Sequence, residues 1–239
     1  MAPVRIESDG ALAAIVLDDP ATRNALGPEA VELASSFAAQ AADADAVRLV
    51  LVTGANGVFC SGAAIREWEA ADPSGEQLAD RGTALCDGLA ALPVPVLAAL
   101  PGHAVGGGAE LALAADWRIA DPAAELRFVH AGFGLVPGFG GLRRLERLVG
   151  PAVALRLLAT RARVGAEEAL ALGLVDAIVP VDAQRAWAEA RAAELAGSGR
   201  DAVAAIKRAL RHGDERAEFR RVWPSRSLPD RLGSEPRLP

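Results

Sequence analysis

Short apolar runs alternate with helical stretches along the first hundred residues, and this alternation restricts the possible folds more than any other feature. The runs at 11–17, 47–53 and 96–100 have the length and composition of buried strands. Between them, Pro28 opens a helical stretch to about residue 42, and a second stretch covers about 77–92. Because strands that alternate with helices usually pair in parallel, we predict an α/β fold.

The second part of the chain has a different pattern, which is almost wholly helical from Gly140 onward. Helices are predicted over 142–149, 153–158, 167–172, 183–195, 202–210 and 215–222. The stretch from about Glu218 is rich in Arg, Pro and Ser, and we expect it to be loosely ordered. The predicted organisation is therefore an α/β core over residues 1–195 and a shortened helical C-terminal region with a loose tail over 196–239.

Length and charge exclude several classes of protein. The 239 residues suit one sizeable domain, and the net charge of −6 has no basic cluster of the kind that binds nucleic acid. No apolar run approaches the roughly 20 residues that cross a bilayer, so we expect no membrane partner. Cys60 and Cys86 form no metal-ligand pattern. With no secretory signal at the N-terminus, we expect a cytoplasmic protein.

The first segment with a chemical signature runs from Val52 to Arg66. A predicted strand enters a loop with three glycines, which is followed by small residues and the start of a helix. Small side chains let main-chain N–H groups approach a ligand closely. Taken alone, the segment fits an ordinary strand-to-helix connection equally well.

The second such segment follows the strand at 96–100, where Gly106, Gly107 and Gly108 open a helix that contains Glu110. Free N–H groups at a helix start carry partial positive charge and favour an anionic oxygen. Glu110 lies on an otherwise apolar helix, where an unpaired carboxylate is costly. It is a candidate catalytic group, and the alternative is that it only caps the helix.

Both segments resemble the crotonase (enoyl-CoA hydratase/isomerase) superfamily, and three further segments follow the same family in the same order. The similarity covers about residues 10–210. The matching segments are Arg23-Asn24-Ala25-Leu26, Phe59-Cys-Ser-Gly62-Ala63-Ala64-Ile65, Gly106-Gly107-Gly108-Ala109-Glu110-Leu111-Ala112, Gly134-Leu-Val-Pro-Gly-Phe-Gly-Gly141 and Ala166-Glu-Glu-Ala-Leu-Ala-Leu-Gly-Leu-Val-Asp176.

The resemblance implies a spiral of ββα units with a helical C-terminal part, assembled as a homo-trimer or a hexamer. It implies an acyl-CoA substrate of fatty acid metabolism, with CoA arriving as part of the substrate and no metal or separate cofactor. The backbone amides of Ala63 and Gly107 would form an oxyanion hole for the thioester oxygen. The loop of Ser61, Ala63, Ala64, Ile65 and Arg66 would bind CoA, with Arg66 either beside a phosphate or ribose or simply solvated.

The family pattern is broken at two positions. Hydratases of this family use two glutamates; Glu110 corresponds to the first, which activates water, but His130 occupies the position of the second. Ala64 replaces an aspartate. His130 could donate the proton that glutamic acid gives elsewhere, steer the site toward decarboxylation or C–C hydrolysis, or merely line an altered pocket. Because isomerases of this family rely on the missing carboxylate, hydration is the favoured reaction.

The sequence thus predicts an enoyl-CoA hydratase-like lyase with Glu110 and His130 as a mixed catalytic pair. Two alternatives stay open. One is another crotonase-type reaction, namely decarboxylation or C–C hydrolysis at the same oxyanion hole. The other is a catalytically impaired protein that binds acyl-CoA.

Overall fold

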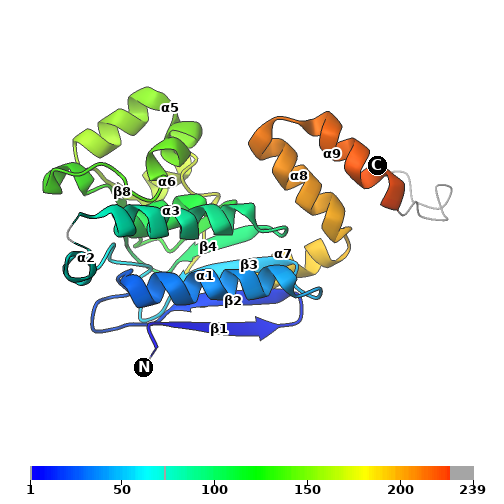
Figure 1. Cartoon of the computed structure of the whole chain (residues 1–239), viewed down its shortest axis with the longest axis horizontal. Coiled ribbons are helices and arrows are strands. Elements are labelled where there is room, and N and C mark those ends of the chain that lie inside the picture. Colours follow the sequence, from blue (N-terminus) through cyan, green and yellow to red (C-terminus); the bar gives the residue numbers. More distant parts are fainter. Residues whose placement is uncertain (1, 73, 227–239) are drawn as a thin grey trace.

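The computed structural model describes residues 2–72 and 74–226, and a six-stranded sheet lies at its centre (Figure 1). The strand order is β1-β2-β3-β4-β6-β9; β1 and β2 are antiparallel and the other neighbours are parallel. The strands are β1 (Val4–Asp9), β2 (Leu12–Leu17), β3 (Leu49–Gly54), β4 (Val96–Leu100), β6 (Trp117–Ala120) and β9 (Ala177–Ile178). The three predicted strands are thus β2, β3 and β4, which are three of the four interior strands of this sheet.

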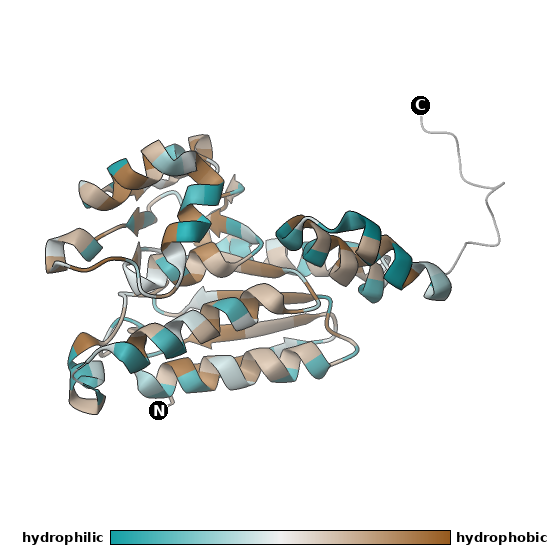
Figure 2. Cartoon of the chain, turned by 45° about the horizontal axis from the view of Figure 1, so that its top comes forward, coloured by the Kyte–Doolittle hydropathy of each residue, from teal (hydrophilic) through white to brown (hydrophobic). Residues whose placement is uncertain are grey.

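The central strands are apolar throughout because both faces of the sheet are covered. On one face, Ile15, Val52 and Ala98 belong to a core shared with α1 (Pro28–Asp43), α3 (Glu76–Ala91) and α4 (Gly107–Ala114). On the other face, alternate residues such as Ala14 and Leu51 pack against α7 (Val181–Ala196). A strand buried on both faces has a continuous apolar sequence rather than an alternating one. Figure 2 shows this concentration of apolar residues in the interior.

A second, smaller sheet holds the elements that surround the candidate site. It has the order β5-β7-β8, from β5 (Ala104–Val105), β7 (Glu125–Arg127) and β8 (Arg163–Gly165). Between its strands lie α4, the short η1 (His130–Phe133) and α5 (Gly141–Ala159). The helix α5 breaks at Gly150, whose φ is 74°, and Pro151 follows. That break explains why the sequence predicts two helices, at 142–149 and 153–158, where the structure has one kinked helix.

The C-terminal helices α8 (Arg200–His212) and α9 (Glu215–Val222) extend away from the sheets (Figure 1). Asp116 anchors α8, because it accepts hydrogen bonds from Lys207 Nζ at 2.7 Å and from Arg211 Nη2 at 2.8 Å. A cavity of about 480 Å³ lies between α8 and the main body, lined in part by Leu113, Leu148, Ile206 and Leu210. It is not lined by the candidate catalytic residues.

The predicted helix at 215–222 is confirmed as α9, and Glu218 within it pairs with Arg208 at 2.7 Å, so the loose order expected from Glu218 is wrong for this helix. The residues at 227–239 lie outside the described part of the chain. The segment after Gly140 is almost wholly helical, as predicted, and only the short strands β8 and β9 interrupt its helices. Strands of two or three residues are too short to show a periodic pattern. Among the described residues, no helix has the length and apolar character that a membrane crossing requires.

Candidate active site

The loop after β3 and the turn before α4 are joined by main-chain hydrogen bonds. Cys60 N donates to His103 O at 3.2 Å, and Val105 N donates to Cys60 O at 2.9 Å. Gly62 has a φ of +110°, which side-chain-bearing residues rarely adopt, and a Cβ there would lie 3.0 Å from Val105 O. Glycine at this position therefore permits the two turns to approach each other.

This approach brings the N–H groups of Ala63 and Gly107 together. A Cβ on Gly107 would lie 3.4 Å from Ala63 N, and a Cβ on Gly62 would lie 3.9 Å from Gly107 N. Because Gly107 is the first residue of α4, its N–H has no acceptor within the helix. Within residues 2–72 and 74–226, neither N–H group donates a hydrogen bond. Both donors can therefore bind an oxygen atom of a ligand.

Glu110 lies one turn into α4, where its carboxylate accepts three main-chain hydrogen bonds from the loop before α5 and from the first residue of α5. Gly138 N donates to Oε1 at 3.2 Å, while Phe139 N and Gly141 N each donate to Oε2 at 2.8 Å. The residue is only 2% exposed. The hydrogen bonds of the Glu110 carboxylate go to His130, Gly138, Phe139 and Gly141 rather than to the N–H groups at the start of α4, so within the described residues Glu110 does not have the capping role that the sequence left open. Its charge is compensated by the loop instead.

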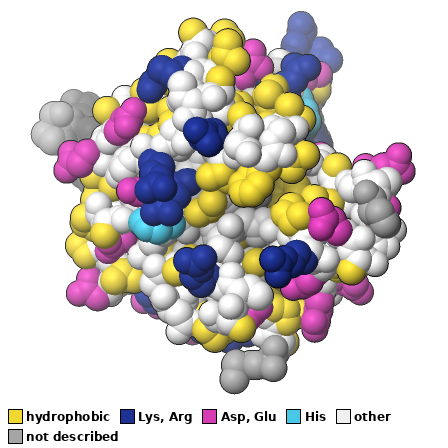
Figure 3. All heavy atoms as spheres, turned by 90° about the vertical axis from the view of Figure 1, so that its left-hand side faces the viewer, with side chains coloured by type: hydrophobic (Ala, Val, Ile, Leu, Met, Phe, Trp, Pro, Cys, Tyr) yellow, Lys and Arg dark blue, Asp and Glu magenta, His cyan; other side chains and the backbone are white. Residues whose placement is uncertain are grey.

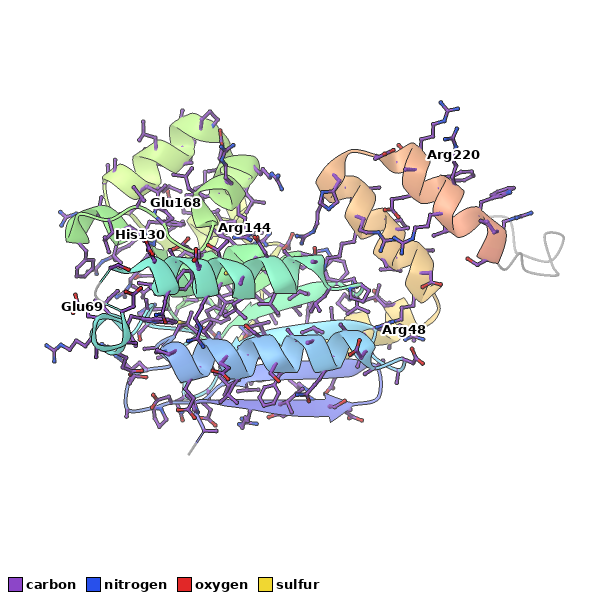
Figure 4. The ribbon with its side chains drawn as sticks, viewed as in Figure 1. Arg48, Glu69, His130, Arg144, Glu168 and Arg220 are labelled. Carbon is purple, nitrogen blue, oxygen red and sulfur yellow. The ribbon has the colours of Figure 1, made fainter. Side chains whose placement is uncertain are left out.

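His130 lies in η1 and contacts Glu110, with 3.0 Å between Nε2 and Oε1. Its side chain is 10% exposed, and its Nδ1 is buried with no hydrogen-bond partner in the described part of the molecule. A Cβ on Gly106 would lie 4.0 Å from Nε2, so the pair borders the turn that carries Gly107. In Figure 4, His130 lies on the same side of the molecule as Glu69, which belongs to α2 (Ile65–Ala71).

Phe139 is a neighbour of the site that the sequence pattern does not single out. Its ring is 2% exposed and lies between two glycines: Cε2 is 2.8 Å from the Cβ position of Gly107, and Cδ1 is 2.1 Å from that of Gly82. The motif Gly134–Gly141 marked this loop as relevant. The sequence around Phe139 does not indicate its contact with Gly82, because the two residues come from different elements of the fold.

Comparison with known proteins assigns the chain to a family. The model of the enoyl-CoA hydratase/isomerase family matches residues 7–227. The chain belongs to this family. A probable enoyl-CoA hydratase of Rhodobacter capsulatus is 37% identical over 237 residues, which cover 98% of this chain and 87% of that protein. The mitochondrial enoyl-CoA hydratase domain-containing protein 2 of Bos taurus is 39% identical over 187 residues, but these are only 63% of its length.

Solved structures of the family have the same fold. The crystal structure of an enoyl-CoA hydratase from Bacillus anthracis superposes with a TM-score of 0.86 at 30% identity, over 93% of this chain and 90% of that one. The predicted crotonase-like α/β fold with a helical C-terminal part is therefore confirmed, as is membership of the crotonase superfamily. The chain spans less than two thirds of the bovine relative.

The family loop at 61–66 leads from the paired N–H groups to the surface. Ser61 Oγ donates to Thr22 O at 2.7 Å, which ties the loop to the segment after β2. Ala64 is the N-cap of α2 (Ile65–Ala71), and Ile65 is 41% exposed. Arg66 is also exposed. The structure thus directs Ser61 inward and presents Ile65 and Arg66 to solvent.

The two thiols near the site are not candidate nucleophiles. Burial raises the pKa of Cys60 to about 12, although the Gly62 amide opposes the shift. Burial likewise raises the pKa of Cys86 to about 12, with the Arg144 charge opposing it. Since the thiolate is the reactive form, both residues are inert at neutral pH. Among the described residues, no cluster of His, Cys, Asp and Glu is arranged to hold a metal ion.

The face to which α2 and η1 belong combines apolar and basic side chains (Figure 3). Phe133, Leu135 and Val136 are 74%, 53% and 75% exposed, in the segment that directly follows His130. A cavity of about 410 Å³ lies beside η1 and is lined by Val129, Gly132, Phe133, Thr160, Arg161 and Arg163. Exposed apolar residues beside cations suit a ligand with an acyl part and an anionic part.

Proposed function

We propose that this protein is an enoyl-CoA hydratase-like lyase that adds water to a 2-enoyl-CoA thioester. The observation that carries the proposal is the proximity of two free N–H donors, at Ala63 and Gly107, to the acid–base pair of Glu110 and His130. Preorganised donors of this kind stabilise the negative charge that develops on a thioester oxygen. The membership of the family supports the same substrate class.

The proposed reaction proceeds through an enolate. Water attacks Cβ of the enoyl group, and the electrons of the double bond move onto the thioester oxygen. The N–H groups of Ala63 and Gly107 hold that oxygen, and each such donor contributes on the order of 10²–10³ in rate. The enolate then collapses and Cα takes a proton, which gives the 3-hydroxyacyl thioester. The Glu110–His130 pair supplies the groups that move the protons.

Recognition of CoA is assigned to the loop at 61–66 and its surroundings. The main chain around Ala63 and Ala64 would contact the nucleotide part, and the exposed Arg66 would meet a phosphate or ribose. The exposed apolar residues after His130 would contact the acyl part or cover it. Both contacts leave the thioester carbonyl between the two N–H donors.

Activity assays separate this function from its rivals. Crotonyl-CoA, malonyl-CoA and a β-diketone substrate should be offered in parallel, and hydration of crotonyl-CoA should be fastest. Preferential decarboxylation or C–C hydrolysis would instead assign another reaction of the family to the site. Tight binding of butyryl-CoA without turnover of any substrate would show that the protein only binds acyl-CoA.

We also propose that the protein assembles into a homo-trimer or a hexamer through its C-terminal helices. Ile206 and Leu210 of α8 are 60% and 83% exposed, and Phe219 of α9 is 58% exposed. Apolar side chains of this size on an extended pair of helices favour burial against another subunit. Light scattering coupled to gel filtration should give a trimeric or hexameric mass, and Leu210→Asp should lower it.

A further inference from the structure

The cavity of about 410 Å³ beside η1 borders the candidate active site. Val129, which lines this cavity, directly precedes His130 in the chain. Val129 Cγ2 lies 3.4 Å from the Cβ position of Gly106, and His130 Nε2 lies 4.0 Å from the same point. Gly106 in turn precedes Gly107, whose N–H is one of the two free donors. The wall of the cavity at Val129 therefore adjoins the turn on which the thioester oxygen is proposed to bind.

Arg161, another residue of the cavity wall, is held against η1 by an unusual backbone conformation. Its φ of 57° lies in the left-handed region, which residues with a side chain rarely adopt. Its Cδ and Nη1 lie 2.9 Å and 3.5 Å from the Cβ position of Gly132 in η1. The arginine side chain thus crosses the place that a side chain at Gly132 would fill. Backbone strain of this kind is concentrated at functional sites.

The third basic feature of the cavity is a pair of arginines on neighbouring strands. Arg127 of β7 and Arg163 of β8 are direct partners in the antiparallel register, and like charges in this arrangement are destabilising. Glu125 binds Arg127 at 2.7 Å and offsets one of the two charges. Within residues 2–72 and 74–226, the side chains of Arg161 and Arg163 have no ion pair or hydrogen bond. The cavity therefore presents two guanidinium groups that can bind an anion.

We propose that Arg161 and Arg163 bind a carboxylate at the far end of the acyl group, so that the preferred substrate is an ω-carboxylated 2-enoyl-CoA. The inference rests on the proposed function and specifies its substrate. With the thioester carbonyl held between the two N–H donors, the acyl chain passes Val129 and enters the cavity. The ring of Phe133 contacts its methylene groups, and the guanidinium groups bind the carboxylate through charge-assisted hydrogen bonds.

The phosphates of CoA are the other anionic groups of such a substrate, and arginine binds them equally well. The position of the cavity favours the acyl end. The proposed CoA loop at 61–66 leads into α2, whereas the cavity lies at η1 and β8; Figure 1 shows α2 below α3 and β8 above it. The apolar side chains of Val129 and Phe133 in the cavity wall also suit methylene groups better than a phosphate.

The test compares two substrates that differ only at the end of the acyl chain, where 2-hexenedioyl-CoA has a carboxylate and 2-hexenoyl-CoA a methyl group. Wild type should hydrate the dicarboxylic substrate with a kcat/KM at least about 10-fold higher. Arg161→Gln/Arg163→Gln should lower this kcat/KM by about 10–100-fold and leave the value for 2-hexenoyl-CoA within about 2-fold. The matched control is Arg220→Gln, which removes an exposed arginine of α9 (Figure 4) and should change neither value.

Two results would overturn the proposal. An equal loss of kcat/KM for both substrates in the double variant would show that the arginines bind the CoA part or support the fold. A wild-type kcat/KM for 2-hexenoyl-CoA equal to or above that for 2-hexenedioyl-CoA would show that the cavity does not receive a carboxylate.

Binding of saturated analogues separates this inference from the proposed function, because adipyl-CoA and hexanoyl-CoA cannot be hydrated. Calorimetry should give wild type an affinity for adipyl-CoA at least about 10-fold higher, and the double variant should lose this difference. If both results are found but neither enoyl substrate is hydrated, the proposed function fails while the carboxylate site stands. Equal affinities in wild type would overturn the carboxylate site even in an active hydratase. Circular dichroism verifies that each variant is folded.

Discussion

A methyl group added at Gly82 in α3 should disturb the active site from outside it. The new Cβ would lie 2.1 Å from Cδ1 and Cε1 of Phe139, whereas carbon atoms pack at about 3.5–4.0 Å. The opposite edge of the ring faces Gly107, and Phe139 is 2% exposed, so the ring is enclosed by other residues. The ring must therefore move by more than about 1 Å, and there is little space for it.

The size of the effect follows from a comparison with Gly88 in the same helix. A Cβ at Gly88 meets nothing within 4 Å, so Gly88→Ala should stabilise the protein by about 0.5–1 kcal/mol through helix propensity. Gly82→Ala has the same gain but also an overpacking cost of about 1–3 kcal/mol. The two variants should differ by that cost, which corresponds to a Tm lower by about 2–12 °C for Gly82→Ala.

Activity should change in the same direction, because Phe139 N donates to Glu110 Oε2 at 2.8 Å. A displacement of 1 Å near a reacting group can lower the rate by about 10². Hydration by Gly82→Ala should thus show kcat/KM about 10–100-fold below wild type, with Gly88→Ala unchanged. Thermal melts and crotonyl-CoA kinetics test both statements. Equal Tm and equal kcat/KM for the two variants would refute the packing argument.

Three other predictions concern stability. Burial raises the folded-state pKa of Cys60 and Cys86 from 9.0 to about 12, so the stability that these thiols contribute is retained below pH 9 and lost as the pH rises above it. Between pH 8 and pH 10 the unfolding free energy, measured by urea titration, should fall about 3 kcal/mol more in wild type than in Cys60→Ala/Cys86→Ala. Asn24→Ala should cost about 2–4 kcal/mol, since Asn24 has a φ of 62° and its Nδ2 donates to three main-chain carbonyls. The same titration should show a smaller loss for the exposed Asn56→Ala. Trp68→Phe should cost about 1–3 kcal/mol, because Trp68 is 2% exposed and its Nε1 donates to a main-chain carbonyl at 2.7 Å; a Tm equal to wild type would contradict this.

Part of the fold could be predicted from local pattern alone. The runs that became β2, β3 and β4 are apolar at every position, because both faces of these strands are buried. The edge strand β1 has a sequence of mixed polarity, Val-Arg-Ile-Glu-Ser-Asp, and was not predicted. Its pairing with β2 is decided by the hairpin and by the position of β2 in the sheet. Strands at a sheet edge lack the uniform burial that marks central ones.

The candidate site likewise divides into residues that the sequence predicts and contacts that only the structure shows. The glycine segments and their order were enough to single out Ala63, Gly107, Glu110 and His130, and the structure brings these four residues to one place. The sequence did not reveal that the loop before α5 encloses Glu110, since those contacts span about 30 residues. Hydrogen bonds between a side chain and a distant main chain leave no periodic trace in the sequence.

The sequence by itself determined the class of fold, the family and the identities of the polar groups, because these depend on residue type, spacing and order. The tertiary structure decided which hydrogen-bond partners surround each of these groups. Glu110 and His130 are both acid–base residues in isolation, but three main-chain donors surround the carboxylate while Nδ1 of the imidazole has no partner among the described residues. Saturation of a hydrogen-bonding group is a property of its three-dimensional neighbours, and those neighbours come from distant parts of the chain.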